Sequence, residues 1–140
     1  MQGIYFEDLS IGQSAELTYT VTDETIRGFA QVSGDDNPVH LDQAYAETTQ
    51  FGGRIAHGML SASFISAVIG TRLPGYGSIY LGQSLRFRRP VKIGDEVTAR
   101  ATVTGLEPEK GRVTLETVCL VAGKPVLEGE ALVMAPRKAI

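Results

Sequence analysis

The sequence has 140 residues, of which 43% are apolar and 21% are charged, a composition typical of one globular domain. A formal charge of -3 at neutral pH excludes a global positive field that would attract nucleic acid, although a local basic cluster could still bind a phosphorylated ligand. The N-terminal region has no signal-peptide pattern, and no apolar run is long enough to span a bilayer, so we expect a soluble cytoplasmic protein.

The first elements are a strand and a helix. Apolar and polar residues alternate over residues 15–21, which predicts a strand with one buried face. Thr22 and Asp23 follow, and their side-chain oxygens can accept from the unpaired amides of a helix's first turn. The turn-forming residues 34–38 are expected to end this helix.

The next helices lead to the middle of the chain. Asp42 is expected to cap a short helix over residues 43–48, and a flexible turn at residues 51–54 follows it. Over residues 58–68, small and apolar residues occupy every side of a helix. A helix that is apolar on all sides is expected at the centre of a fold.

The C-terminal half alternates between strand-like segments and turns. Strands are predicted at residues 78–88, 95–106, 112–121 and 125–134. Turns suited to antiparallel hairpins are predicted at residues 92–94, 108–111 and 122–124. A buried helix and an antiparallel run predict the α+β class, with a sheet of about five strands wrapped around a central helix. Cys119 lies in an apolar strand and is interpreted as an inert core thiol.

Asp35 and His40 lie in one short stretch, Gly34-Asp35-Asp36-Asn37-Pro38-Val39-His40, predicted to be a loop between two helices. Together on a rigid loop they could hold a water molecule, since an imidazole titrates near neutrality and a carboxylate can orient the imidazole or the water. The alternative is a turn in which the side chains bond the local backbone and Pro38 fixes φ. The residue types alone favour this turn.

Gly58 opens the predicted central helix. Unpaired amides and the positive end of the helix dipole suit the oxygen of a polarised carbonyl, although glycine could equally permit close packing. His57 is interpreted as a residue that caps the helix or orients the loop. Ser66 and Ile69, spaced by three residues, could line the same pocket, but a lone buried serine more often bonds its own helix.

Three stretches together resemble a known family. Residues 34–40, 55–60 and 77–85 closely resemble the MaoC-like (R)-specific enoyl-CoA hydratases, also called hydratase 2, and the resemblance covers nearly the whole chain. It implies a hot-dog fold in one domain over residues 1–140, whose sheet joins that of a second subunit in a homodimer. It also implies a hydro-lyase that adds water reversibly to a trans-2-enoyl-CoA and gives an (R)-3-hydroxyacyl-CoA.

The resemblance also implies roles for individual residues. Asp35 and His40 take the catalytic positions, and the amide of Gly58 becomes the donor to the thioester oxygen. Coenzyme A enters as part of the substrate, so no separate cofactor is expected. No metal is expected either, because two histidines and scattered carboxylates lack a ligand spacing such as His-Glu-x-x-His.

A basic group of Arg86, Arg88 and Arg89 precedes Pro90. Arg86 and Arg88 fall on the same face of the predicted strand and could bind the phosphates of coenzyme A through charge-assisted hydrogen bonds. The alternative is a solvated strand edge whose charges resist aggregation.

Other functions stay open at this point. The same site could dehydrate a 3-hydroxyacyl group on acyl carrier protein or act on another acyl-CoA, and a thioesterase is a weaker alternative. A non-enzymatic alternative is an acyl-CoA binding module or a noncatalytic subunit, which would not need the Asp35 and His40 pair. The sequence leaves open the acyl chain length and the pathway, whether polyhydroxyalkanoate precursor supply or fatty acid oxidation.

Overall fold

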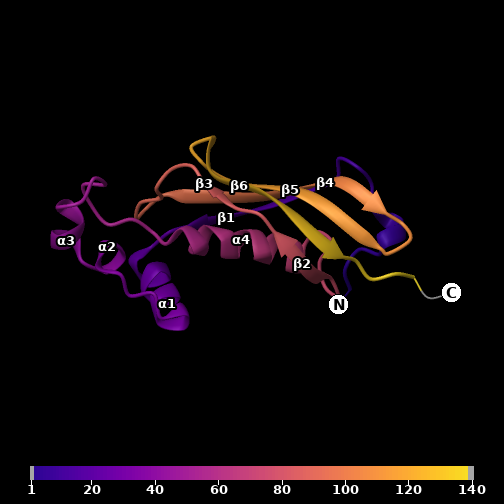
Figure 1. Cartoon of the computed structure of the whole chain (residues 1–140), viewed down its shortest axis with the longest axis horizontal. Helices are drawn as coiled ribbons and strands as arrows, with labels where there is room; N and C mark the ends of the chain where they lie inside the picture. Colours follow the sequence, from indigo (N-terminus) through magenta and orange to yellow (C-terminus); the bar gives the residue numbers. More distant parts are fainter. Residues whose placement is uncertain (1, 139–140) are drawn as a thin grey trace.

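The computed structural model describes residues 2–138, which form an antiparallel sheet packed on a long helix. The strands are β1 (Ser14–Thr20), β2 (Ile79–Gln83), β3 (Arg86–Phe87), β4 (Glu96–Glu107), β5 (Arg112–Val121) and β6 (Lys124–Met134). Their order is β1-β4-β5-β6-β2, and β3 pairs with β6. The helices are η1 (Phe6–Asp8), α1 (Asp23–Ser33), α2 (Pro38–Leu41), α3 (Gln43–Glu47) and α4 (Gly58–Thr71). The expected α+β class, with a sheet around a central helix, is confirmed, and the sheet has six strands (Figure 1).

Two strand expectations need correction. The strand expected over residues 78–88 is divided into β2 and β3 at Ser84, where the side-chain hydroxyl, not a backbone carbonyl, accepts from the amide of Glu130 in β6 at 3.0 Å. The turn at residues 92–94 does not form a hairpin between neighbouring strands. Its Gly94 amide instead donates to the carbonyl of Val21 at 2.7 Å, which ties the turn to the end of β1.

Local capping explains where the short helices begin. The Thr22 hydroxyl accepts from the amide of Thr25 at 3.1 Å at the start of α1, and Asp42 accepts from Tyr45 at 3.1 Å at the start of α3, as expected. The stretch between them was expected to be a loop, but Asn37 caps a further one-turn helix, α2. Asparagine before proline suits a helix start, because proline needs no amide partner at the first position. His40 therefore lies in a helix.

Helix α4 packs against β1, β4, β5 and β6 and supplies much of the core. Its buried apolar residues are Leu60, Phe64, Ile65, Val68 and Ile69. The opposite face, with Met59, Ser63 and Ser66, is exposed in a single chain, so burial on every side is not observed. Cys119 is fully buried, and burial raises the pKa of its thiol to about 12, which fits the expected core role.

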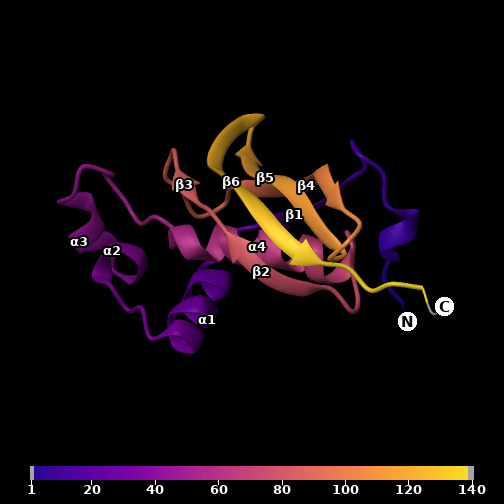
Figure 2. The same ribbon diagram turned by 45° about the vertical axis from the view of Figure 1, so that its right-hand side comes forward.

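The short helices α1, α2 and α3 gather at one end of the molecule, beyond the start of α4, while both chain ends lie at the other (Figures 1 and 2). This arrangement places the turn after α1, helix α2 and the first residue of α4 next to one another. Among residues 2–138, no helix is both long and apolar enough to cross a bilayer.

Replacing Leu115 tests the core on the central strand β5. Leu115→Ala should lower the free energy of unfolding by about 2–5 kcal/mol, because the side chain is fully buried and its removal leaves a cavity. Val32→Ala is the control, since Val32 is 88% exposed and its truncation should change stability by less than about 0.5 kcal/mol. Urea unfolding at one fixed protein concentration measures both, and equal effects would contradict this assignment of the core.

Candidate active site

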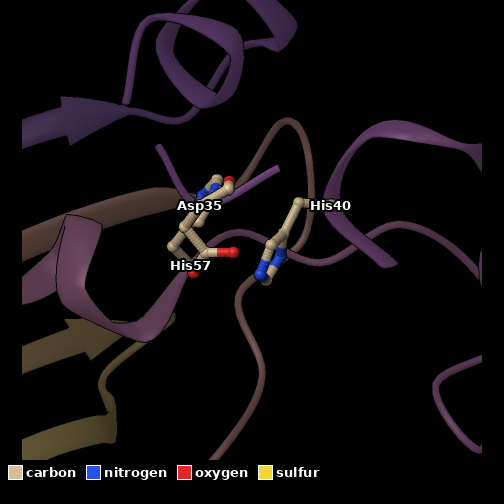
Figure 3. A group of neighbouring side chains, drawn as sticks. All are labelled: Asp35, His40 and His57. Atoms are coloured by element: carbon tan, nitrogen blue, oxygen red, sulfur yellow. The ribbon is translucent and has the colours of Figure 1, made fainter. Parts of the chain in front are cut away.

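Asp35, His40 and His57 come together at the start of α4 (Figure 3). One carboxylate or ring-nitrogen atom from each residue lies within 4.8 Å of those of the other two. Asp35 comes from the turn after α1, His40 from α2 and His57 from the residue before α4. A carboxylate oxygen of Asp35 points toward the His40 ring (Figure 3). The pair expected from the sequence therefore converges.

The tautomer of His40 follows from its hydrogen bond. His40 is 8% exposed, and its Nδ1 lies 2.8 Å from the carbonyl oxygen of Ile55. A carbonyl oxygen can only accept, so Nδ1 carries the proton in this bond. In the neutral ring, Nε2 then keeps its lone pair. His40 can therefore accept a proton at Nε2 without losing the bond that positions it.

His57 makes the reciprocal bond. Its Nε2 lies 2.9 Å from the carbonyl oxygen of Asp35, so Nε2 carries a proton and donates in this bond. The His57 and His40 rings stack with centroids 3.8 Å apart, and Phe29 lies 4.9 Å from the His57 ring. His57 is the N-cap residue of α4 by position, but its side chain makes no capping bond. The expectation that it orients the loop agrees with this geometry, while a side-chain cap is not observed.

The surroundings of His40 favour its neutral form. Burial lowers the pKa of His40 below its ordinary value of 6.5, and the neighbouring His57 ring lowers it further. The Ile55 carbonyl and the Asp35 carboxylate act in the opposite direction and do not outweigh burial. The His40 ring is thus neutral at neutral pH, and its Nε2 can accept a proton, as a general base requires.

Arg54 connects helix α2 to the start of α1 beside the site, and it was not predicted as a site residue. Its Nε donates to the carbonyl oxygen of His40 at 2.7 Å, and its Nη2 donates to Asp23 at 2.6 Å. The guanidinium groups of Arg54 and Arg27 lower the pKa of the Asp23 carboxyl. Because the Arg54 side chain is only 11% exposed, this bridge fixes the end of α2 against the start of α1.

The turn interpretation of Asp35 is also correct, and it is compatible with a catalytic role. Oδ1 of Asp35 accepts from the amide of Asn37 at 3.3 Å, as in a local turn of this type. Asp35 itself is exposed. A carboxylate accepts several hydrogen bonds, so this one leaves capacity for a water molecule.

A cavity of about 480 Å³ opens beside Gly58 and is lined by His57 and Phe87 among others. Any side chain at position 58 would collide with Phe87, because a Cβ there would lie 2.6 Å from Cε1 of that ring. Close packing is thus one reason for glycine at this position. The first amides of α4 still lie at the positive end of a helix of 14 residues, at the edge of the cavity.

Comparisons with known proteins agree with this geometry. Residues 8–129 match the family model of the MaoC like domain. The chain belongs to the MaoC-like family. It is 61% identical to an (R)-specific enoyl-CoA hydratase of Rhodospirillum rubrum over 96% of this chain and 93% of that protein. The fold matches the R-hydratase PhaJ1 of Pseudomonas aeruginosa with a TM-score of 0.93 and 54% identity, over 98% of this chain and 88% of that one.

A second solved structure gives the same result. The (R)-hydratase of Aeromonas caviae, described as involved in PHA biosynthesis, matches with a TM-score of 0.90 and 47% identity, over 93% of this chain and 99% of that one. The sheet wrapped around α4 is thus the hot-dog fold that the sequence motifs implied.

The remaining expected residues of this MaoC-like protein lie apart from the dyad. Ser66 is exposed and Ile69 is 1% exposed in the core, so the two do not share a face, and neither lines the cavity in a single chain. Arg86 lies beside a smaller hollow of about 220 Å³, while Arg88 borders both hollows.

The dyad and His57 also have the donor atoms that a divalent cation could use, one from each side chain. Each imidazole already donates one ring nitrogen to a backbone carbonyl, which leaves Nε2 of His40, Nδ1 of His57 and the Asp35 carboxylate for this purpose.

The pKa of His40 gives a prediction for the pH dependence of turnover. The value of kcat/KM should fall as pH drops through the pKa of His40, with a midpoint below 6.5, because only the neutral ring accepts a proton. Stability should fall in the same direction. A pKa lower in the folded than in the unfolded chain means that protonation favours unfolding once pH drops below about 6.5. An acid limb centred above 6.5 would contradict this assignment.

Proposed function

We propose that this protein is an (R)-specific enoyl-CoA hydratase, a hydro-lyase that adds water reversibly to a trans-2-enoyl-CoA and gives an (R)-3-hydroxyacyl-CoA. One observation carries the proposal: a ring nitrogen of buried His40, whose Nδ1 is held by the Ile55 carbonyl, lies within 4.8 Å of an Asp35 carboxylate oxygen at the start of α4. The close identity to (R)-specific enoyl-CoA hydratases supports the substrate class and the stereochemistry.

Hydration requires a base, a proton donor and a group that stabilises charge on the thioester oxygen. Nε2 of His40 removes a proton from the water as its oxygen bonds to the β-carbon of the substrate, and Asp35 orients that water. The electron pair of the double bond moves toward the thioester, and a proton returned through the dyad reaches the α-carbon. Because both side chains contact the same water in this scheme, donation of the proton to the α-carbon is assigned to the pair.

Gly58 supplies the third group in this mechanism. Its amide is the first of α4, and the positive end of the helix favours the enolate-like oxygen that develops on the thioester. No separate cofactor enters this scheme, and coenzyme A is part of the substrate. No metal is needed, because the carbonyl is polarised by an amide and the water by the dyad.

Substitution of the dyad tests the proposal. Asp35→Asn and His40→Gln should each lower kcat for crotonyl-CoA hydration by roughly 10² or more, as expected for the loss of acid-base help. Asp36→Asn is the matched control, because Asp36 is the exposed neighbour in the same turn and has no role in the scheme. Circular dichroism verifies the fold of each variant. Hydration at the wild-type rate by a folded His40→Gln variant would refute the dyad.

The same assay separates the alternative functions. Loss of enoyl absorbance over a C4 to C12 series gives the acyl chain preference, and chiral analysis of the product gives the stereochemistry. A higher kcat/KM with an acyl carrier protein thioester would favour the dehydratase alternative, while release of free thiol would expose a thioesterase.

We further propose a homodimer joined along β2. This edge strand exposes Ile79, Tyr80 and Leu81, whereas the other edge strand, β1, exposes polar side chains such as Thr18. An exposed apolar edge strand is a template for pairing with another chain. Both views place β2 beside the second half of α4 (Figures 1 and 2), and a partner at this edge would provide a wall for the acyl chain.

A charge on β2 tests this dimer. Leu81→Lys should convert the protein to a monomer in light scattering at micromolar concentration, because a buried unpaired charge disfavours an apolar interface. Thr18→Lys on the opposite edge strand is the matched control and should leave the dimer intact. A Leu81→Lys variant that stays dimeric would contradict an interface along β2.

The cellular setting remains a proposal. The A. caviae relative acts in PHA biosynthesis, and the same reaction here would supply (R)-3-hydroxyacyl precursors for such a polyester. The cytoplasmic location stays a prediction from the sequence.

A further inference from the structure

The wall of the cavity beside Gly58 is mainly apolar and has cationic residues at one part only. The apolar lining includes Phe51, Phe87, Val91 and Leu127. The cationic residues in its lining are Arg88 and Arg89. Its volume of about 480 Å³ lies in the range of small-molecule sites, and a few polar groups in an apolar cavity are typical of sites that orient a ligand.

The three arginines of the 86–89 segment have different surroundings. Arg86 borders the smaller hollow, where Glu128 also lies, and not the cavity beside Gly58. Arg88 donates to Glu128 at 3.0 Å, so a carboxylate already neutralises its charge. Among residues 2–138, Arg89 forms no ion pair. Arg89 is therefore the arginine of this segment whose charge is uncompensated at the cavity.

The substrate has two unlike ends on either side of its thioester. The acyl chain is apolar, whereas the carrier arm contains amides and ends in phosphate. If the thioester oxygen is at Gly58, one end must enter the cavity with Arg89, and the other must lie along the exposed face of α4. Beyond Met59, which also borders the cavity, that face presents Ser63 and Ser66, and α4 contains no cationic residue, so this face suits the acyl chain.

We propose that the cavity beside Gly58 takes the phosphopantetheine arm of the substrate and that Arg89 binds its phosphate-bearing end. The assignment rests on the proposed hydratase function and adds a residue that selects the carrier. It replaces the expected phosphate contact at Arg86 and gives Arg88 a smaller part, because Glu128 competes for its guanidinium.

Substrates with and without phosphate test the role of Arg89. Arg89→Ala should raise KM for crotonyl-CoA about fivefold with kcat within about twofold, as expected for loss of a solvent-accessible charge-assisted contact. KM for crotonyl-pantetheine, which carries no phosphate, should not change. The matched control is Arg72→Ala, which removes an exposed arginine at the far end of α4 and should alter neither KM.

The remaining outcomes of these measurements either support the role of Arg89 or overturn it. Loss of affinity with crotonyl-CoA alone assigns Arg89 to the nucleotide phosphates, and an equal loss with a crotonyl-acyl carrier protein assigns it to the phosphate of the arm. Both support the proposal. An unchanged KM for crotonyl-CoA, an equal rise for crotonyl-pantetheine, or the full effect in Arg86→Ala instead would overturn it. Wild-type protein that hydrates neither substrate would refute the hydratase function itself.

Discussion

Two hydrogen bonds between imidazoles and backbone carbonyls hold the candidate active site together. His40 in α2 donates to the carbonyl of Ile55, just before α4, while His57 at the start of α4 donates to the carbonyl of Asp35, just before α2. The segment that contains Asp35 and His40 and the segment that contains Ile55 and His57 thus each donate one ring hydrogen bond to a carbonyl of the other. Because the rings also stack, neither segment can shift without breaking a part-buried hydrogen bond and a packed contact.

The chemistry of the site depends on this reciprocal pairing. A carbonyl accepts but cannot donate, so it fixes which nitrogen of each ring carries the proton. For His40 the result is a free lone pair at Nε2, and burial keeps the ring neutral. Arg54 strengthens the arrangement, because it binds the carbonyl of His40 and the carboxylate of Asp23 at once. The base is therefore oriented mainly by groups other than the Asp35 carboxylate, which is left exposed to meet water.

Features set by neighbouring residues were predictable from the sequence. The caps at Thr22 and Asp42 need partners only three residues away, and the alternation in β5 gives its bounds directly. Helix α2 was missed because Asn37 and Pro38 serve equally in turns and at helix starts. The dyad itself was predicted through its resemblance to a family motif, since the residue types alone favoured a turn.

Features set by distant contacts could not be predicted. Arg54 lies 31 residues from Asp23, and no local pattern joins them. The break between β2 and β3 lies where the Ser84 hydroxyl meets the amide of Glu130, 46 residues away in β6. Ser66 and Ile69 have the spacing of neighbours, but which side of α4 the sheet covers decides that one is exposed and the other buried.

The most direct test of this account is the nitrogen NMR spectrum of the protein labelled with ¹⁵N-histidine, which contains two histidines and thus four ring nitrogens. At neutral pH the structure predicts a neutral His40 ring with the proton on Nδ1 and a free lone pair on Nε2, and a His57 ring whose Nε2 carries a hydrogen-bonded proton. Assignment by single substitution of each histidine identifies the rings. A His40 ring that is protonated at Nε2, or cationic at neutral pH, would contradict the account, because no lone pair would then face the reacting water.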